Sequence, residues 1–432
     1  MQDLKEFIHY TLSNTLSMIG ISIYIMADVY FIAKGVGPEG IAALNLALPI
    51  YNLVNACGLM LAVGSAIYFI QAKAQNNHLA RNQAYSTGLI ACLIIGGLFL
   101  FIGLIASSQL TKWLGADAHV YESTHVYLRY VLLFAPFFIL NQFFSLFVKN
   151  DGHPQLAMYA MLAGSLFNTI FDYVFIFIFD MGMKGAVLAT AFSPILGILV
   201  NSWHLIKGKP NFSFQVQAFQ LQRLKAALSA GLPSFISELS VGLVMLVFNF
   251  LILDLAGNTG VAAYGILVNL LFVIIAIYNG IAMGAQPLLG RFYALRDFKG
   301  LQRILHYSLI TVILVSIVFY SVALLIPHEL IALFNYQEDL AMVQVAYQAF
   351  GPYFSQCLFL GINTVLIMYF ISSNRSRLAQ VLAILKGFAL VLPLALVLTH
   401  LAGLSGLWLS MTLSEGIVTA LGIYYWRSSP RL

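Results

Sequence analysis

Long apolar segments separated by short polar ones dominate this chain of 432 residues. A helix needs about 20 apolar residues to cross the hydrocarbon core of a bilayer. Twelve segments meet that length, namely 7–33, 41–70, 84–110, 120–147, 155–178, 184–206, 227–256, 261–290, 303–326, 341–370, 377–400 and 404–426. Charged residues make up only 9% of the sequence, against about 25% in a soluble domain. The pattern predicts an all-α polytopic membrane protein with twelve transmembrane helices, and it excludes a soluble enzyme, a secreted module and a disordered scaffold.

The loops between these segments differ in charge from one side of the membrane to the other. Of the 21 Lys and Arg residues, sixteen fall in loops on one side and three on the other. The sixteen are Lys5, Lys73, Arg81, Lys149, Lys207, Lys209, Arg223, Lys225, Arg291, Arg296, Lys299, Arg303, Arg375, Arg377, Arg427 and Arg431. The opposite loops contain Lys34, Lys112, Lys184, Glu39, Asp117, Glu122, Asp180, Glu329, Glu338 and Asp339. Because loops rich in Lys and Arg stay in the cytoplasm, we predict that both termini are cytoplasmic.

Several function classes lack their sequence signals. The net charge of +5 comes from singly scattered basic residues, which does not indicate a nucleic-acid partner. Cys57, Cys92 and Cys357 lie in apolar segments without a CxxC pair, so neither disulfides nor a zinc site are expected. The chain has no HExxH motif, GxSxG elbow, P-loop or dinucleotide fingerprint. We therefore expect no enzyme activity and no cofactor, and uphill transport would have to draw on an ion gradient.

The two halves of the chain resemble each other. GIAALNLALPIYNLVNACGLMLAVG, from Gly40, aligns without gaps with GVAAYGILVNLLFVIIAIYNGIAMG, from Gly260. Likewise, GMKGAVLATAFS from Gly182 matches GLSGLWLSMTLS from Gly403. Six segments in each half indicate a parallel repeat about an axis along the membrane normal. We predict two pseudo-symmetric six-helix bundles, organised as an N-terminal lobe (1–206), a cytoplasmic linker (207–225) and a C-terminal lobe (226–432).

Two carboxylates are predicted at the same depth within the membrane. Asp28 lies six residues before Lys34 and Asp172 lies eight before Asp180, which places both roughly 9–12 Å below the outer surface. Asn168 precedes Asp172 by one helical turn, and Thr190 reaches the same level from the opposite direction. A carboxylate within the membrane costs about 2.5–3.5 kcal/mol and is a functional candidate by default. We therefore predict that these four residues form a hard-oxygen site for a proton or Na⁺.

The repeat sharpens this prediction, because only the first half carries the polar set. The equivalent positions in the second half are Phe248, Ala389, Pro393 and Met411. Residues that merely stabilised the shared architecture should be present in both copies. The alternative is a static role, in which Asp28 and Asp172 each bond a neighbouring helix backbone or pair with Arg129, a base at similar outer depth.

A third acid, Glu238, follows Pro233 in the seventh segment. Proline removes a backbone hydrogen bond and can open a kinked, solvated pocket. Glu238 is therefore a candidate to face a cation, with a structural role as the alternative. Tyr24, one turn before Asp28, and Met161 are candidates to line a cavity near the acids, because aromatic and Met side chains suit flat organic cations.

Three stretches carry a family resemblance. NDGHPQLAMYAMLAGSLFNTIFDYVFIFIFDMGMKGAVLATAFS, residues 150–193, contains a G-x-P, an N-x-x-x-D and a G-x-x-G-A-x-x-A-T pattern. GIAMGAQPLLGRFYALRDFKGLQRIL begins at Gly280, and GLPSF runs from Gly231 to Phe235. With these motifs the chain resembles, over nearly its whole length, the multidrug and toxic compound extrusion (MATE) family, and in particular its DinF-like bacterial branch.

The resemblance implies a V-shaped pair of six-helix lobes and drug export driven by H⁺ or Na⁺. It implies a multi-pass monomer in the bacterial cytoplasmic (inner) membrane, with organic cations and membrane lipids as partners. Its cation site carries over onto Asp28, Asn168, Asp172 and Thr190, and its cavity positions onto Tyr24, Asn141 and Met161. The sequence departs from the family in its first segment, where many members carry a proline and this chain has Ser13 opposite Pro233. Gly20 is the remaining candidate for a bend.

These observations predict a cation-coupled antiporter that exports organic, amphipathic cationic drugs by alternating access. Burial favours neutralisation of Asp28 and Asp172 by the coupling ion, which is expected to change the packing of the first, fifth and sixth segments and release the drug outward. The alternative is a flippase for lipid-linked oligosaccharides or other lipids of the same wider superfamily. Such proteins typically place several basic residues in the cavity. A membrane-embedded hydrolase that uses two aspartates is a third class.

The basic residues within the membrane disfavour an anionic cargo. Arg129 and Lys386 are the only two in the interior of the predicted segments, since Lys184, Arg303 and Arg377 stand at segment ends. Lys386 and Glu415 lie near mid-depth in adjacent segments, so we predict that they form a buried ion pair.

Overall fold

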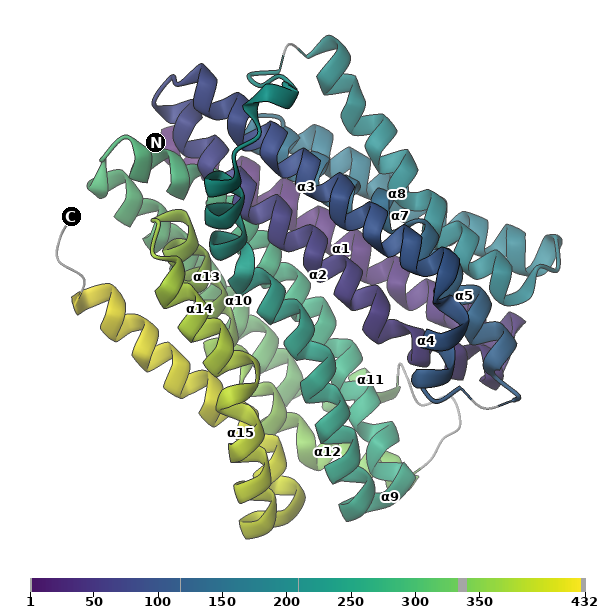
Figure 1. The fold of residues 1–432 in the computed structure, drawn as a ribbon. Coiled ribbons are helices and arrows are strands. Elements are labelled where there is room, and N and C mark those ends of the chain that lie inside the picture. Colours follow the sequence, from purple (N-terminus) through teal and green to yellow (C-terminus); the bar gives the residue numbers. More distant parts are fainter. Residues whose placement is uncertain (1, 117, 209, 333–339, 429–432) are drawn as a thin grey trace. The chain divides into compact units, whose positions relative to one another are not determined.

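The computed structural model describes residues 2–116, 118–208, 210–332 and 340–428. Within these ranges every regular element is a helix, and none is a strand (Figure 1). Five loop residues of the charge argument lie outside the described residues, namely Asp117, Lys209, Glu338, Asp339 and Arg431.

The first half of the chain forms six of the predicted crossings. Its helices are α1 (Gln2–Gly35), α2 (Pro38–Ala74), α3 (His78–Ile105), α4 (Ser107–Trp113), α5 (Tyr121–Leu133), α6 (Ala135–Asn150), α7 (Pro154–Tyr173), the π-helical turn η1 (Val174–Ile178) and α8 (Gly182–Lys207). Helices α5 and α6 together make one crossing, bent by 48°. Pro136 stands in the first turn of α6, where its missing amide hydrogen and fixed φ favour a new helix start.

The second half repeats this plan. Its elements are η2 (Val216–Ala218), α9 (Leu221–Ala294), α10 (Phe298–Leu325), α11 (Pro327–Ala332), α12 (Leu340–Phe354), α13 (Cys357–Ser372), α14 (Ser376–Ile384), the π-helical turn η3 (Leu385–Ala389) and α15 (Val391–Ser428). Helix α9 contains two crossings, Leu221–Gly257 and Thr259–Ala294, that meet at the non-helical Gly257. Helices α12 and α13 form a crossing bent by 44°.

The number of crossings agrees with the twelve predicted. Among the described residues, nine helices are long and apolar enough to cross a membrane, and the two bent pairs raise the number to eleven. One of the nine, Ser376–Ser428, has 53 residues. Its helical length of about 80 Å far exceeds a hydrocarbon core of about 30 Å. The backbone leaves the helical conformation at Ala402 and Gly403, so this run holds two crossings.

The third crossing begins earlier than predicted. The expected segment was 84–110, whereas α3 extends from His78 to Ile105. The side chain of Asn77 accepts a hydrogen bond from the amide of Ala80 (3.0 Å) and caps the helix within a polar loop. Apolar content alone does not reveal such a start.

The internal repeat is visible in the backbone. Gly37 (φ 87°) and Gly257 (φ 61°) both lie in the left-handed region at the turn between the first two crossings of each half. At the turn before the last crossing of each half, Gly182 has φ 52° and Gly403 has φ 57°. Glycine enters this region most readily because it has no Cβ, so these turns favour glycine. The matched pairs support the duplication inferred from the sequence.

The chain divides into two compact units. The N-half unit consists of Leu16–Glu238 with Ala294–Arg296, and the C-half unit of Met1–Thr15, Leu239–Tyr293 and Asp297–Leu432. Helix α1 therefore starts in the C-half unit and continues into the N-half unit. Helix α9 starts in the N-half unit and continues into the C-half unit after Glu238. The division into lobes at 206 and 226 follows the chain order and remains a prediction.

Helix α1 is helical without a break from Gln2 to Gly35. Gly20, the candidate for a bend, lies against α7, where an added Cβ would be 2.5 Å from Leu162 Cδ2. This glycine therefore serves close helix packing in the present conformation.

The polar connector after α8 is held on the N-half unit. Phe212 is buried, and its ring packs against those of Phe69, Tyr85 and Phe147. Three backbone amides of the connector donate to side chains of α3, with distances of 2.9 Å from Ser213 to Asn82, 3.0 Å from Gln215 to Ser86 and 3.2 Å from Gln220 to Thr87. Side chains spaced along α3 thus satisfy the connector's donors, and the connector is a packed segment of this unit.

Asp151, in the loop between α6 and α7, contacts residues of α2, α8 and the connector. Its fully buried carboxylate lies 2.9 Å from Lys73 Nζ and 2.9 Å from His204 Nε2. It also accepts hydrogen bonds from the backbone N (3.0 Å) and Nδ2 (2.8 Å) of Asn211. Burial alone would raise the pKa of Asp151, but the His204 hydrogen bond, the Lys73 charge and the Asn211 amide outweigh it and hold the pKa well below its usual range.

We expect Asp151→Asn to lower the melting temperature at pH 7, since removing one partner of a buried ion pair costs about 3–5 kcal/mol. A lowered pKa stabilises the fold fully above the unfolded Asp pKa of about 3.9, and the effect is lost as the pH falls toward the folded value. The difference in melting temperature from wild type, measured in detergent, should stay constant from pH 7 to about 4 and shrink below it. Asp180→Asn, at an exposed carboxylate, is the control. A difference that is equally large at pH 3 would contradict the prediction.

A buried carboxylate pair as the candidate functional site

The four predicted cation-site residues come together inside the N-half unit. Asp28 projects from α1, Asn168 and Asp172 from α7, and Thr190 from α8. All four are buried, with 7% of Asp28, 5% of Thr190 and none of Asn168 or Asp172 exposed. The depth argument made from helical rise therefore identified residues that converge in space.

The two carboxyl groups are direct partners. The side chains of Asp28 and Asp172 lie within hydrogen-bonding reach of each other. Asn168 is held between Asp172 and α8. With its amide turned so that donors meet acceptors, Asn168 Nδ2 donates to Asp172 Oδ2 (3.2 Å), and its oxygen accepts from the backbone N (3.2 Å) and Oγ1 (3.3 Å) of Thr190.

This arrangement requires a positive partner or a proton. Two carboxylates in direct contact cannot both remain charged without one. One buried oxygen of each group, Oδ1 of Asp28 and Oδ1 of Asp172, has no hydrogen-bond partner in the protein. A buried acceptor without a hydrogen bond costs free energy, so these two oxygens are the atoms to which a proton or a small cation would bind.

The backbone of α7 changes conformation next to Asp172. Helix α7 changes to the π-helical turn η1 directly after Tyr173, and such turns occur frequently at functional sites. Ser193 Oγ of α8 donates to the carbonyl of Gly164 of α7 (2.8 Å), and an added Cβ at Gly164 would lie 3.0 Å from that hydroxyl. Close packing of α7 on α8 thus holds Asn168 and Thr190 in register.

The static pairing with Arg129 is not what the structure shows. The Arg129 side chain is exposed, and none of the ion pairs among the described residues joins it to Asp28 or Asp172. The two carboxylates contact each other instead. Among the same residues, no group of three or more His, Cys, Asp or Glu side chains is arranged to hold a metal.

Three tyrosines lie around the pair. Tyr24 was predicted as a cavity residue, whereas sequence reasoning missed Tyr51 and Tyr127. Tyr127 of α5 is buried and hydrogen-bonds to Thr190. Tyr24 and Tyr51 hydrogen-bond to each other through their side chains. All three lie close enough to Asp28 for an electrostatic interaction. Tyr127 lies six residues into its helix from the outer end, so the depth argument applied to Thr190 would have found it.

The four predicted cavity residues lie in the same unit but do not form one group. Half-buried Tyr24 and Glu238 both interact with Tyr51, the former by a hydrogen bond and the latter electrostatically. Asn141 lies on α6 against α8, where an added Cβ at Gly197 would be 2.4 Å from its unpartnered Oδ1. Met161, one turn from Ser165 on α7, is half-buried.

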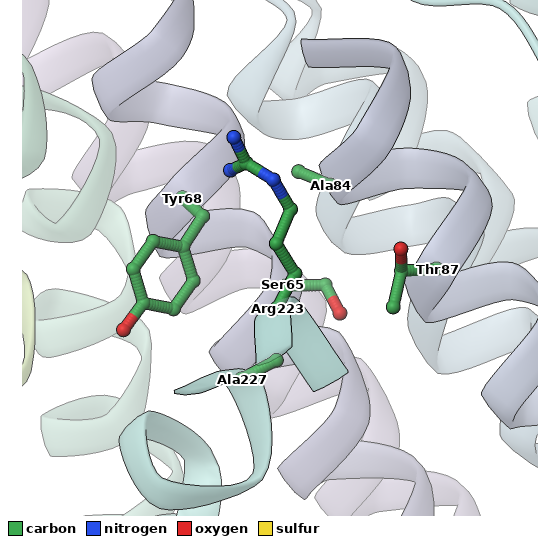
Figure 2. Close-up of a pocket in the computed structure, with 6 residues that line it drawn as sticks. All are labelled: Ser65, Tyr68, Ala84, Thr87, Arg223 and Ala227. Carbon is green, nitrogen blue, oxygen red and sulfur yellow. The ribbon is translucent and has the colours of Figure 1, made fainter. Parts of the chain in front are cut away.

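A small pocket lies elsewhere in the unit, where α2, α3 and the start of α9 meet (Figure 2). It is lined by Ser65, Tyr68, Ala84, Thr87, Arg223 and Ala227. Ser65 is buried and its hydroxyl has no partner. Figure 2 shows the guanidinium of Arg223 extending away from that hydroxyl, and Arg223 Nε donates to Gln220 Oε1 at 3.0 Å. None of the predicted site residues lines this pocket.

The predicted pair in the C-half unit is present. Lys386 Nζ lies 4.0 Å from Glu415 Oε1 and donates to Thr364 Oγ1 at 3.1 Å. Asn363 Nδ2 donates to the other Glu415 oxygen at 2.6 Å. Asn363 Oδ1 accepts a hydrogen bond from Thr419 Oγ1 at 3.0 Å. Lys386 and Glu415 thus compensate each other within a hydrogen-bonded network.

Twelve apolar crossings, an internal repeat and a buried carboxylate pair define a class of polytopic membrane transport protein. The model of the MatE family matches residues 15–174 and 233–397. The chain belongs to the MatE family, which its motifs had resembled, and it is accordingly a transporter and not an enzyme. The narrower DinF-like assignment stays a prediction.

Named relatives cover almost the whole chain. It is 26% identical over 415 residues to the multidrug export protein MepA of Staphylococcus saprophyticus, covering 96% of this chain and 91% of the relative. It is 26% identical over 416 residues to MepA of Staphylococcus aureus, with the same coverage.

Solved structures show the same fold. An outward-facing multidrug resistance MATE family transporter of the MOP superfamily superposes with a TM-score of 0.92 and 22% identity, covering 98% of this chain and 95% of that one. A MOP superfamily transporter from Pyrococcus furiosus, described as having a binding pocket of reverse polarity, superposes with a TM-score of 0.91, 22% identity and the same coverage. The predicted twelve-helix fold class is confirmed.

Proposed function

We propose that the protein is an antiporter that exports organic, amphipathic cationic drugs in exchange for H⁺ or Na⁺. The observation that carries the proposal is the direct contact of Asp28 and Asp172, with one unpartnered buried oxygen on each. The family membership and the names of the MepA relatives support drugs as the cargo.

The coupling ion would act on the contacts of three helices. Asp28 lies on α1, Asp172 on α7 and Thr190 on α8. When both carboxylates are charged they repel each other, whereas a shared proton or Na⁺ draws them together. Loading the ion therefore changes the preferred packing of α1 against α7 and α8. To swing a two-state equilibrium from mostly one state to mostly the other takes about 5 kcal/mol, which an ion gradient can supply over one or two ions.

Na⁺ and H⁺ fit the same residues in different ways. For Na⁺, the two carboxylates, the oxygen of Asn168 and the hydroxyl of Thr190 are hard-oxygen ligands. For H⁺, one proton between the two carboxylates satisfies the contact. Neither case calls for a resident cofactor.

The drug would bind near Tyr24, Asn141, Met161 and Glu238, which lie in the same unit as the ion site. A carboxylate attracts a cation, and an aromatic face adds a cation–π contact of about 0.5–2 kcal/mol. Met adapts to cargo of varied shape.

We place the protein as a monomer in the bacterial cytoplasmic (inner) membrane, with both termini on the cytoplasmic side. Lipids of the surrounding bilayer are its other partners. The excess of Lys and Arg in the loops of one side supports this orientation.

The lipid-flippase alternative is disfavoured by the basic residues. Lys386 is paired with Glu415, and Arg129 is exposed. Neither is left inside the protein as a free cation for a pyrophosphate group.

The test uses purified protein in vesicles loaded with ethidium, under an imposed pH gradient or an imposed Na⁺ gradient. We expect efflux under at least one of the two gradients and none without a gradient. The gradient that works identifies the coupling ion. If neither gradient drives efflux from vesicles that contain folded protein, the antiporter proposal is wrong. Flipping of labelled lipid in the same vesicles would favour the alternative.

A further inference from the structure

The C-half unit contains a buried carboxylate of which only one oxygen is held by hydrogen bonds from a neutral side chain. Glu415 projects from α15 and is buried. Asn363 Nδ2 donates both to Glu415 Oε2 (2.6 Å) and to the Glu415 carbonyl (2.9 Å). Asn363 is itself fixed, because its Oδ1 accepts from Thr419 Oγ1 (3.0 Å). The other carboxylate oxygen, Oε1, lies 4.0 Å from Lys386 Nζ.

The ion site of the N-half unit has the same construction. There Asn168 Nδ2 donates to Asp172 Oδ2, the Asn168 oxygen accepts from Thr190, and Asp172 Oδ1 is left without a partner. In both units an asparagine holds one carboxylate oxygen, a threonine fixes the asparagine, and the second carboxylate oxygen is available. The two units differ in the charged partner of this carboxylate, which is the acid Asp28 in the N-half unit and the base Lys386 in the C-half unit.

This likeness is not inherited through the internal repeat. In the repeat, Glu415 is equivalent to Pro194 and Lys386 to Ser165. The charged pair is therefore present in the second half alone, as the carboxylate pair is present in the first half alone. Residues that merely stabilised the shared architecture should be present in both copies, so each half has its own charged set.

The ammonium of Lys386 lies where a bound cation would lie. Its Nζ is 3.1 Å from Thr364 Oγ1 and 4.0 Å from Glu415 Oε1. The Thr364 hydroxyl donates its hydrogen to the Leu360 carbonyl (2.8 Å), so its oxygen presents lone pairs to the ammonium. A carboxylate oxygen and a hydroxyl oxygen are the kind of ligand that hard cations take.

The contact between Lys386 and Glu415 is loose for an ion pair. A charge-assisted N–H···O bond is about 2.7–2.9 Å long, whereas 4.0 Å separates these two groups. The Lys386 side chain is 19% exposed, and a lysine stem of four carbons is flexible. Lys386 also stands in the π-helical turn η3, a conformation that is frequent at functional sites. The ammonium can therefore withdraw from the carboxylate while the surrounding helices stay folded.

We propose that Glu415 and Thr364 form a second site for H⁺ or Na⁺, and that the ammonium of Lys386 is a tethered competitor that fills this site in the present structure. A proton binds Glu415 Oε1, whereas Na⁺ binds both Glu415 Oε1 and Thr364 Oγ1. In either case Lys386 keeps its own protons and moves off the carboxylate. The carboxylate exchanges one cation for another, so it is never left buried without compensation, which is costly. This site adds to the proposed function and does not depend on the N-half carboxylate pair.

Few other titratable groups lie near this site. Helices α12 and α13, which pack on α15, contain no Asp, Glu, Lys, Arg or His. The Cys357 thiol, on α13, lies within electrostatic reach of Glu415. From α12, the Ser355 hydroxyl lies 2.6 Å from that of Thr412 on α15, and both are neutral. A response of this site to H⁺ is therefore assigned to Glu415 and its partner Lys386.

The test measures melting temperatures of the purified full-length protein in detergent, because an ion that binds the folded state raises them. Every protein carries Asp28→Asn and Asp172→Asn, which remove the ion response of the N-half unit, and this double variant is the background. NaCl is exchanged for choline chloride at constant ionic strength, and the pH is varied in choline chloride alone. Adding Lys386→Met removes the competitor. We expect the half-saturating concentration of Na⁺ or H⁺ to fall by about 5–150-fold, the usual range of coupling between two ligands.

Two further variants complete the test. Glu415→Gln, added to Lys386→Met, should abolish the response that Lys386→Met gained. Lys299→Met removes an exposed lysine of α10 in the same unit and should leave the background response unchanged. If Lys386→Met does not fold, the background is compared with and without Glu415→Gln. The weaker response of the native site should then be lost with Glu415.

The outcomes separate this inference from the proposed function. A folded Lys386→Met protein with the ion response of the background would overturn the inference. A gain that survives Glu415→Gln would overturn it too, since the ion would then bind elsewhere. In the comparison that keeps Lys386, equal responses with and without Glu415→Gln have the same consequence. A wild-type protein whose ion response equals that of the background would instead contradict the N-half ion site and leave this inference standing.

Discussion

Replacing Asp172 with Asn should reduce gradient-driven ethidium efflux to the level of empty vesicles, with the protein still folded. Asn has nearly the same shape and mimics the neutral carboxyl, so the contact with Asp28 survives as a hydrogen bond. What is lost is the charge that the coupling ion must neutralise. Asp28→Asn should have the same effect, and the double variant should be no worse than either single one, because the two groups act as one unit.

The measurement compares efflux rates in vesicles with equal amounts of each protein. Asp180→Asn serves as the control, since that carboxylate is exposed and lies at a loop position with φ 50° that Asn tolerates. A folded Asp172→Asn protein that exports ethidium at the wild-type rate would rule out the carboxylate pair as the coupling site.

The largest loss of stability is expected at the crossing of α2 and α9 within the N-half unit. A Cβ added to Gly231 would lie 1.9 Å from the carbonyl oxygen of Met60, and one added to Gly64 would lie 1.9 Å from that of Ala227. Both obstructing atoms belong to helix backbone and cannot rotate away. Gly231→Ala must therefore push the helices apart, at a cost of about 1–3 kcal/mol or more.

We expect Gly231→Ala to lower the yield of monodisperse protein and to lower its melting temperature in detergent by about 2–6 °C. Gly97→Ala in α3 is the matched control. Nothing lies within 4 Å of the Cβ it would add, and Ala favours a helix over Gly by about 0.5–1 kcal/mol. Equal melting temperatures for the two variants would show that the close crossing does not limit stability.

Much of the fold and of the site could be predicted from the chain. Apolar segments of about 20 residues can be satisfied in lipid only as helices, because each backbone group must bond within its own segment. Helical rise then determines the depth of each residue, which selected Asp28, Asn168, Asp172 and Thr190. The boundary of α3 was misjudged, because its start depends on the Asn77 cap and not on apolar content.

The sequence by itself determined how deep each residue lies along its helix, because the rise per residue is fixed. It also determined the internal repeat and the glycine turns that the two halves share. Rotation about the helix axis and the choice of neighbouring helix were decided only by the tertiary structure. That packing brought Asp28 of α1 against Asp172 of α7 and left Arg129 exposed. The physical reason is that helices are specified by local hydrogen bonds, whereas contacts between them depend on how side chains distant in sequence fit together.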